Sequence, residues 1–389
     1  MIDSYIKGRD CCGCMLCAEV CPVNAIEESV INGFVFPNVN KGKCIKCQKC
    51  VKACPIKNSE NLKIQNSMSS ILISSNKSIS EKKKSTSGAA FIELASEIIG
   101  GGGTVYGAEY EKSWHVRHTR AIDECGIRKF QGSKYVQSRI RECYKQILED
   151  LKAGKTVLFS GTPCQVAAVK TFIQINKVKT GKLITVEILC YGVPSPEVFE
   201  KHIEMVEDKY SEVEKYVFRD ERNGWGHDYI HSARLKNGSE LYNNSFLQAY
   251  ASLFSKRLIF RESCFSCKFA SQQRCADITI GDCWGVEHIA PECMDQYGVS
   301  QIWLNTDAGK ELWDKVEYKF DSRKCTLREL LPYNTVLSKP ADKPDEYGEF
   351  WELYKKKGYE YVLRRFTRYG KTFVIRHKLK RLLERIRIV

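Results

Sequence analysis

The sequence lacks the long apolar runs of a membrane protein: no stretch approaches the roughly 18 consecutive apolar residues that a spanning helix requires. Its first ten residues, MIDSYIKGRD, also lack the apolar core of a secretory signal peptide. These absences predict a soluble, cytoplasmic protein. Cysteines stay reduced in that compartment, so a cysteine pattern is expected to bind a metal or a cluster rather than to form disulfides.

Two common signatures of other enzyme classes are missing as well. No Ser, His and Asp residues have the spacing of a hydrolytic site, which argues against a hydrolase. Four consecutive glycines, residues 100–103, do not fit G-x-G-x-x-G in any register, and they follow a predicted helix at 91–99 instead of preceding one. They are interpreted as the end of that helix, leading into a strand at 104–110.

Net positive charge is small outside the end of the chain. The formal net charge is +14, but residues 355–389 hold thirteen Lys or Arg and only two acids. The remainder is close to neutral, which argues against nucleic-acid binding. Apolar residues recur at helical spacing between 375 and 386, so residues 341–389 are predicted to form a basic helical tail. Such a tail either packs on the body of the protein or contacts an acidic partner or an anionic membrane surface.

Cysteine is abundant, with nineteen residues, and two runs share one spacing. Each run reads C-x2-C-x2-C-x3-C-P, the pattern of bacterial two-cluster ferredoxins, in which the fourth cysteine ligates the other cluster. The first 4Fe-4S cluster is therefore assigned to Cys11, Cys14, Cys17 and Cys54. The second is assigned to Cys44, Cys47, Cys50 and Cys21. Residues 1–58 are predicted to form an α+β ferredoxin-like domain.

Zinc is the alternative metal for these runs, because C-x2-C pairs also suit structural zinc. Zinc sites rarely show four cysteines twice with a proline after each run, so clusters are favoured. Cys12 lies inside the first loop but out of phase with the ligand spacing, and it is predicted to be a spare thiol.

The remainder of the chain has the signals of an α/β domain. Residues 59–87 are rich in serine and are interpreted mostly as linker, with the linker proper at 59–69 and a first strand at 71–74. Strand, helix and strand follow one another across 155–190, which predicts a right-handed parallel crossover. Residues 70–340 are therefore predicted to form an α/β domain with a mixed, partly parallel sheet, divided near residue 190. Further strands are expected at 276–282 and 300–306, and a hairpin at 232–242.

Cysteines gather on this second domain too. Cys164 and Cys190 follow the two crossover strands, so both are expected at the carboxyl edge of the sheet, where open α/β sheets bind ligands. A C-x2-C pair, Cys264 and Cys267, could complete four thiolates around a third cluster. Two further thiols lie in the same stretch and leave the choice of ligands open: Cys275 and Cys283. The others are expected to be buried as small apolar side chains: Cys125, Cys143, Cys293 and Cys325.

Five segments of this domain, in their order along the chain, carry a family resemblance: SKYVQS, VLFSGTPCQVAAVK, CYGVPSP, SCFSCKF and ADITIGDCWG. In them the chain resembles the coenzyme F-420 hydrogenase/dehydrogenase beta-subunit family, and in particular its bacterial members with a two-cluster 4Fe-4S ferredoxin domain in front. The resemblance implies FAD, a 4Fe-4S cluster in the flavin domain, and exchange between single electrons and hydride. It implies that the ligands of this third cluster are Cys164, Cys190, Cys264 and Cys267.

The flavin-contacting stretches of the family match short segments here. They comprise Ser87 and Gly88 before the first helix, and a later set: Gly132, Ser133, Lys134, Tyr135 and Ser138. Residues that flank the first cysteine of the third cluster are expected to face the flavin ring: Thr162, Pro163 and Gln165. The chain departs from the family at SGAA, where a double glycine is usual, and at Tyr191, where His is usual. Arg261 is either a charge that raises the cluster potential or a surface arginine.

The resulting hypothesis is an iron-sulfur flavoprotein oxidoreductase that passes electrons between ferredoxin-type clusters and FAD. FAD would exchange hydride with a small organic substrate, and a redox partner protein or a ferredoxin would deliver or accept electrons. No catalytic residue is assigned. The alternative is a non-catalytic electron-transfer subunit that serves a partner enzyme, with polysaccharide biosynthesis as the setting that the resemblance suggests.

Overall fold

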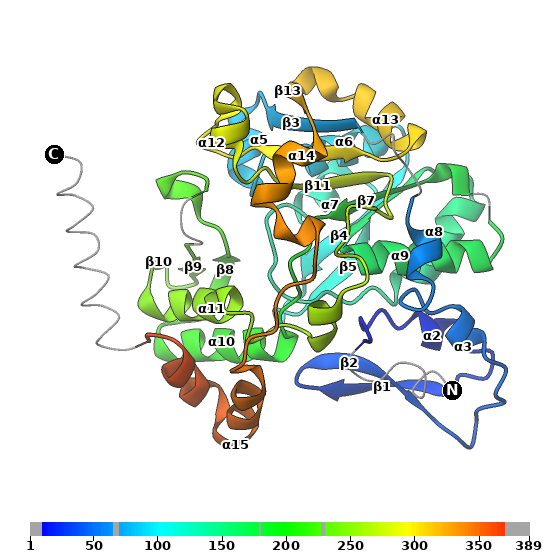
Figure 1. Ribbon diagram of the computed structural model, residues 1–389. Coiled ribbons are helices and arrows are strands. Elements are labelled where there is room, and N and C mark those ends of the chain that lie inside the picture. The colour runs from blue at the N-terminus through cyan, green and yellow to red at the C-terminus, as the bar shows by residue number, and fades with distance from the viewer. Residues whose placement is uncertain (1–9, 65–69, 179, 227–229, 370–389) are drawn as a thin grey trace.

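The computed structural model of the protein describes residues 10–64, 70–178, 180–226 and 230–369. The apolar repeat predicted as a helix at 375–386 lies outside these residues. Figure 1 shows a small N-terminal unit in blue at the lower right, a large sheet above it, and a helical unit at the lower left.

The N-terminal unit is built around an antiparallel hairpin, β1 (Ile26–Ile31) and β2 (Phe34–Val39). Each cysteine run contributes one short helix, α2 (Leu16–Glu19) and α3 (Lys49–Lys52). Both helices begin after a residue in the left-handed conformation, Met15 at φ 55° and Gln48 at φ 62°. The two runs therefore turn alike between their second and third cysteines, and the predicted α+β ferredoxin-like region is confirmed.

An eight-stranded mixed sheet forms the body of the protein, in the order β13-β3-β12-β11-β7-β6-β4-β5. Four central strands run parallel: β4 (Thr104–Tyr110), β6 (Val157–Gly161), β7 (Leu183–Ile188) and β11 (Ile278–Asp282). The flanking strands are antiparallel to their neighbours: β5 (Val116–Ala121), β12 (Ser300–Leu304), β3 (Ser70–Asn76) and β13 (Phe320–Cys325). The predicted crossover and the partly parallel sheet are confirmed.

Helices cover both faces of the sheet. α8 (Cys143–Lys152) and α9 (Pro163–Ile175) pack with Val157 and Phe159 of β6 on one face. α6 (Ala90–Gly100) and α13 (Asp307–Asp314) pack with Leu158 on the other face. Successive β6 side chains thus enter opposite cores, as the two-residue period of a strand requires. Shorter helices complete this body: α7 (Glu124–Arg128), α12 (Val286–Ile289) and α14 (Leu327–Leu330).

The helical unit is inserted between β7 and β11. It contains a three-stranded antiparallel sheet, β8 (Val213–Val217), β9 (Ser232–Leu235) and β10 (Glu240–Tyr242). Around that sheet pack α10 (Pro196–Lys209), α11 (Ser245–Ser255) and α15 (Tyr347–Phe366). α15 is the described part of the predicted basic tail, and its apolar side chains, such as Phe350 and Leu363, are fully buried in this core.

Most of 59–87 was expected to be linker, and this interpretation is wrong for two segments. α4 (Ser59–Leu62) buries Leu62 against the body, and the Ile64 N–H donates to the Arg274 carbonyl at 2.7 Å. α5 (Ile79–Lys84) is capped by Ser78, whose hydroxyl accepts from the Glu81 N–H. The serines that looked like linker composition therefore include a helix N-cap.

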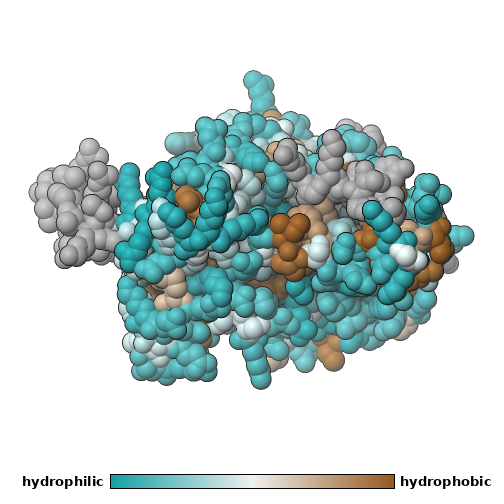
Figure 2. All heavy atoms as spheres, turned by 90° about the horizontal axis from the view of Figure 1, so that it is seen from below, coloured by the Kyte–Doolittle hydropathy of each residue, from teal (hydrophilic) through white to brown (hydrophobic). Residues whose placement is uncertain are grey.

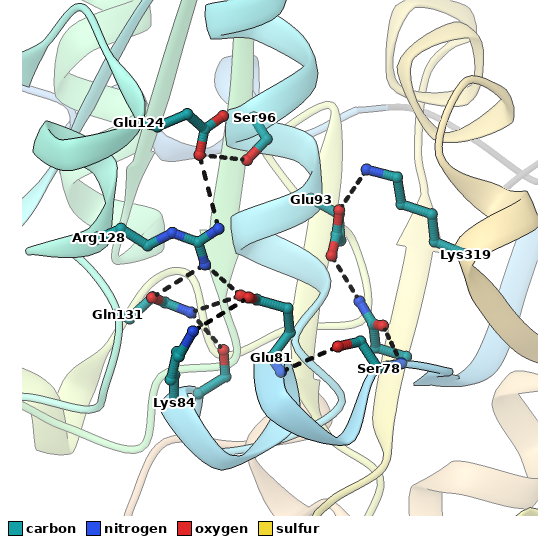
Figure 3. A network of polar contacts seen from close by, with 11 residues as sticks. Ser78, Glu81, Lys84, Glu93, Ser96, Glu124, Arg128, Gln131 and Lys319 are labelled. Atoms are coloured by element: carbon teal, nitrogen blue, oxygen red, sulfur yellow. Dashed lines mark hydrogen bonds and ion pairs between the residues drawn. The ribbon is translucent and has the colours of Figure 1, made fainter.

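Tertiary ion pairs hold α5 in place. Glu81 pairs with Arg128 of α7, and Lys82 pairs with Asp295. Figure 3 shows the Glu81 group beside Glu93 of α6, which pairs with Lys319. Because these partners come from distant segments, the composition of 79–84 alone gave no sign of a docked helix.

None of the helices in the described ranges is both long and apolar enough to cross a membrane. The face seen from below in Figure 2 is mostly hydrophilic, with small, separate apolar patches.

Three histidines lie buried in the folded protein. Burial lowers the pKa of His118 to about 4 and of His231 to about 3, and it lowers the pKa of His202 well below its usual range. His202 contacts the hydroxyls of Tyr216 and Tyr359, at 3.1 and 3.0 Å. These imidazoles are neutral in the folded protein at pH 7.

Acid is therefore expected to destabilise the fold between pH 6.5 and about 4. In this window the unfolded chain binds protons that the folded chain does not, so stability falls as the pH falls. Each imidazole contributes a slope of about 1.4 kcal/mol per pH unit. Urea unfolding at a series of pH values measures the slope. His202→Phe should be less stable at pH 7 but have a shallower slope; an unchanged slope would contradict this account.

Candidate iron-sulfur and cofactor site

Seven of the eight ferredoxin-pattern cysteines fall into two groups in space. Cys11, Cys17 and Cys54 are buried together in the N-terminal core. Burial raises the pKa of the Cys17 thiol, and the nearby Cys11 and Cys54 add to the effect. One cavity of about 220 Å³ is lined by four others: Cys21, Cys44, Cys47 and Cys50. The eighth, the half-buried Cys14, packs against the core that contains α8 and α9. Cys21 thus lies with the second run, as the crossed ligand pattern requires.

These thiols are spread too widely for one ion. Among the residues that the structure describes, no three Cys, His, Asp or Glu side chains form a group that holds a single metal ion. Tetrahedral zinc needs its sulfurs within about 2.3 Å of one point. A cubane keeps its thiolates farther apart, because iron and sulfide lie between them.

A second cysteine group lines a cavity at the carboxyl edge of the sheet. Cys164 lies in the first turn of α9, which begins with a capping box of Thr162 and Gln165. Cys190 follows β7, and a 3-10 turn at Glu262–Ser266 brings Cys264 beside Cys267. All four cysteines line the same cavity, which is called the four-cysteine cavity below. Burial raises the pKa of Cys264 to about 12 and that of Cys190 well above its usual value.

The two thiols that left the ligand choice open lie elsewhere. The buried Cys275 thiol donates to the Glu187 carboxylate at 2.9 Å, and its Sγ also lies 3.3 Å from the Pro163 carbonyl oxygen. Cys283 is buried in a separate core with Cys325 and Cys293 beside it. The sequence expectation of buried thiols is confirmed for Cys143, wrong for the exposed Cys125, and only partly met by two half-buried residues, Cys293 and Cys325.

Cys12 occupies an unexpected position for a spare thiol. It lines the same cavity as Cys164, and its thiol lies beside the thiols of Cys14 and Cys164. Gln137 of the sheet domain holds the loop by donating to the Cys12 carbonyl at 2.8 Å. The first ferredoxin loop therefore reaches into the four-cysteine cavity, which no spacing rule indicated.

A larger cavity of about 500 Å³ lies next to it at the carboxyl ends of the central strands. Eight residues that the resemblance assigned to flavin line it: Ser87, Gly132, Ser133, Lys134, Tyr135, Ser138, Thr162 and Gln165. Two others do not. Pro163 lines the four-cysteine cavity, and Gly88 is packed so tightly that a Cβ there would lie 2.5 Å from the Ser74 carbonyl oxygen.

The Lys134 side chain forms its hydrogen bonds with the loop that precedes it. Its ammonium donates to the carbonyls of Phe130, Gln131 and Gly132, at 3.3, 3.1 and 3.2 Å. Burial lowers the pKa of Lys134 to about 8. Because an ammonium has three N–H donors, Lys134 shapes this wall and can offer a ligand its charge but no further hydrogen bond.

His118 of β5 is a cavity residue that the sequence did not reveal. Its Nε2 lies 2.7 Å from the Ser160 carbonyl oxygen, which can only accept, so Nε2 carries the proton. Since the ring is neutral, Nδ1 is an acceptor, and it has no partner among the described residues. The VRHTRA segment fits no motif; only its alternating pattern hinted that His118 faces inward.

The two departures from the family pattern both fall on cavity walls. Ala89 adopts φ 60°, a left-handed conformation that glycine adopts without strain, which explains the family's glycine preference. Tyr191 lines both cavities, and its side chain is 38% exposed. Because the residue is Tyr where the family usually has His, no imidazole at this position can transfer a proton.

The cavities share a wall formed by the segment after β7. Leu189, Cys190, Tyr191, Gly192 and Val193 line both, together with Val336. A group held by Cys190 is thus separated from the larger cavity only by this segment. Fold and site together define an iron-sulfur protein with a ferredoxin-like unit packed on an α/β domain that has a cofactor-sized cavity.

Family models match both parts of the chain. Residues 10–58 match the 4Fe-4S dicluster domain, which implies two clusters. Residues 154–324 match the family described as the C terminus of the coenzyme F420 hydrogenase/dehydrogenase beta subunit. The chain thus combines a C-terminal domain of the coenzyme F420 hydrogenase/dehydrogenase beta subunit with a 4Fe-4S dicluster domain, and it is an oxidoreductase similar to that beta subunit.

Among solved structures, the chain is similar to a chain in the xenon-derivatised F420-reducing [NiFe] hydrogenase complex from Methanosarcina barkeri. The identity is 19% and the TM-score 0.47, and the alignment covers 78% of this chain and 92% of that chain. No curated protein matches the chain.

Proposed function

We propose that the protein passes electrons between its ferredoxin-type clusters and an FAD bound in the larger cavity, through a third 4Fe-4S cluster held by the four-cysteine cavity. The FAD exchanges hydride with a small organic substrate. The observation that carries this proposal is the shared wall: Cys190 lines both cavities, so a cluster ligand lies directly beside the cofactor cavity.

The four-cysteine cavity fits a cluster. Its thiols come from two strand ends and one tight turn, and no carboxylate or imidazole of the described residues competes as a ligand in its wall except Asp10. Four cysteine thiolates are the usual ligand set of a 4Fe-4S cluster. Cys164, Cys190, Cys264 and Cys267 are assigned to it, with Cys12 as the non-ligand thiol.

The larger cavity fits FAD. Its volume lies in the range of ligand and cofactor sites. The N-terminus of α6 opens into it, and the hydroxyls of Thr86 and Ser133 lie 2.8 Å apart on its wall, a combination that suits a diphosphate. His118 Nδ1 accepts a hydrogen bond from an N–H or O–H of the ligand. Bound FAD supplies the exchange between hydride and single electrons, while these residues bind and orient it.

The partners follow from the same arrangement. The matched family is named for beta subunits, so we assign a redox partner protein or a ferredoxin as the source or acceptor of electrons at the dicluster domain. The substrate reaches the FAD from the open side of the larger cavity, and we place the protein in the cytoplasm, where its thiols stay reduced.

Counting cofactors tests the proposal. Protein purified without oxygen is expected to hold about twelve iron atoms and twelve sulfides per chain, together with one FAD. Eight irons without flavin would refute both the third cluster and the flavin site. Twelve irons without flavin would refute the flavin site alone.

A further inference from the structure

Arg261 is a buried arginine that has no carboxylate partner in the part of the chain that the structure describes. Its side chain is 1% exposed, and no carboxylate of the described residues pairs with it within 4 Å. Its guanidinium donates to neutral acceptors only: Nε to the Cys11 carbonyl at 2.6 Å, Nη1 to Gln137 Oε1 at 3.0 Å, and Nη2 to the Val35 carbonyl at 2.8 Å. The sequence alternative of a surface arginine is therefore wrong.

A buried charge without a counter-charge is costly, and the other buried arginines of this chain avoid that cost. Arg274 pairs with Glu187, and Arg219 pairs with Asp282 at 2.6 Å. Arg261 differs because the groups around it are cysteines. It donates to the Cys11 backbone and lines the cavity of Cys164 and Cys264.

The ferredoxin loop is shaped to admit this guanidinium. Gly13 lies between Cys12 and Cys14 with φ +73°, and a Cβ there would lie 2.7 Å from Arg261 Nη1. Phe36 of β2 covers the opposite side, 4.2 Å from the guanidinium carbon to the ring centroid. Arg261 thus lies between the first ferredoxin loop and the four-cysteine cavity, at the place where Cys12 of that loop enters the cavity wall.

We propose that Arg261 is the shared counter-charge of the first ferredoxin cluster and the third cluster, and that it raises the reduction potential of both. For the third cluster this inference rests on the proposed function. A 4Fe-4S core with four thiolates is an anion, and reduction adds one more negative charge. A fixed positive charge beside two such cores therefore favours their reduced states. It raises the reduction potentials of both clusters together, which suits electron transfer between them.

Two replacements separate charge from packing in the full-length protein. Arg261→Gln keeps hydrogen-bond donors but removes the charge, whereas Arg261→Lys keeps the charge. Arg141→Gln is the matched control, because Arg141 also joins the two units, through exposed ion pairs with Glu19 and Glu28. Iron is counted for each variant, and cluster potentials are measured by redox titration followed by electron paramagnetic resonance.

In Arg261→Gln, two of the three cluster potentials should fall, each by at least ten-fold in the equilibrium constant for reduction, about 59 mV for a one-electron couple. The remaining cluster should move less, and Arg261→Lys and Arg141→Gln should resemble the wild type. Unchanged potentials, or an equal shift of all clusters, would overturn the proposal. Loss of iron in the Gln variant alone would support it; loss in both the Gln and Lys variants would overturn it.

Failure of the proposed function would look different. A wild-type protein with eight irons has no third cluster, whatever the variants do. In that case a lower potential for one of the two ferredoxin clusters in Arg261→Gln still supports Arg261 as the counter-charge of the first cluster, and no shift refutes it.

Discussion

Cys190→Ala is expected to lose about four iron atoms per chain and to abolish electron transfer between the flavin and the ferredoxin clusters. Among the described residues Cys190 is the one cysteine that lines both cavities, and Cys12 contacts Cys164 rather than Cys190 and so is not placed to replace it. Iron should fall from about twelve to about eight. Flavin reduction by electrons that enter at the dicluster domain should drop to background, while FAD content is retained.

Cys12→Ala is the matched control, since Cys12 lines the same cavity. This variant should keep all its iron, because Cys12 is assigned as a non-ligand. Full iron in Cys190→Ala would contradict the third cluster. Loss of about four irons in Cys12→Ala would instead make Cys12 a ligand.

Ser160→Trp is expected to abolish FAD binding while leaving the iron content unchanged. Ser160 lies at the carboxyl end of β6, lines the larger cavity, and shares the strand face of Leu158, which packs towards α6. An indole at this position fills space where the cofactor would lie. The cavity of about 500 Å³ has room for the ring, so the fold should tolerate it.

Absorbance of the flavin and the iron count, measured on the same sample, read the two outcomes separately. Ser160→Ala removes only a hydroxyl and should bind FAD as the wild type does. A flavin content near one per chain in Ser160→Trp would place the cofactor outside this cavity.

The sequence predicted what depends on local spacing and on strand order. The x2 spacing of the two cysteine runs specifies their loops, and the buried strands at 157–161 and 183–188 imply a parallel crossover that puts Cys164 and Cys190 at one edge. These features need only neighbouring residues and the handedness of the crossover. For that reason they could be predicted without knowledge of the tertiary structure.

What the sequence missed depends on contacts between distant segments. The position of Cys12 beside Cys164 and the burial of Arg261 both arise from packing the ferredoxin-like unit on the sheet domain. His118 became a cavity residue because β5 pairs with β4 at the sheet edge, next to the Ser160 carbonyl. Gly88 matched a family motif, yet its role here is close packing against the Ser74 carbonyl.

The four-cysteine cavity also determines the order in which the protein can mature. Each ferredoxin cluster takes three ligands from one short run, so its binding loop exists as soon as that run is synthesised. Cys164, Cys190 and the turn at Glu262–Ser266 meet only after β6, β7 and the inserted helical unit have folded. With the third cluster proposed above, iron enters this site only in a chain whose sheet is complete, and we expect a mutation that loosens the sheet to release this iron before that of the ferredoxin loops.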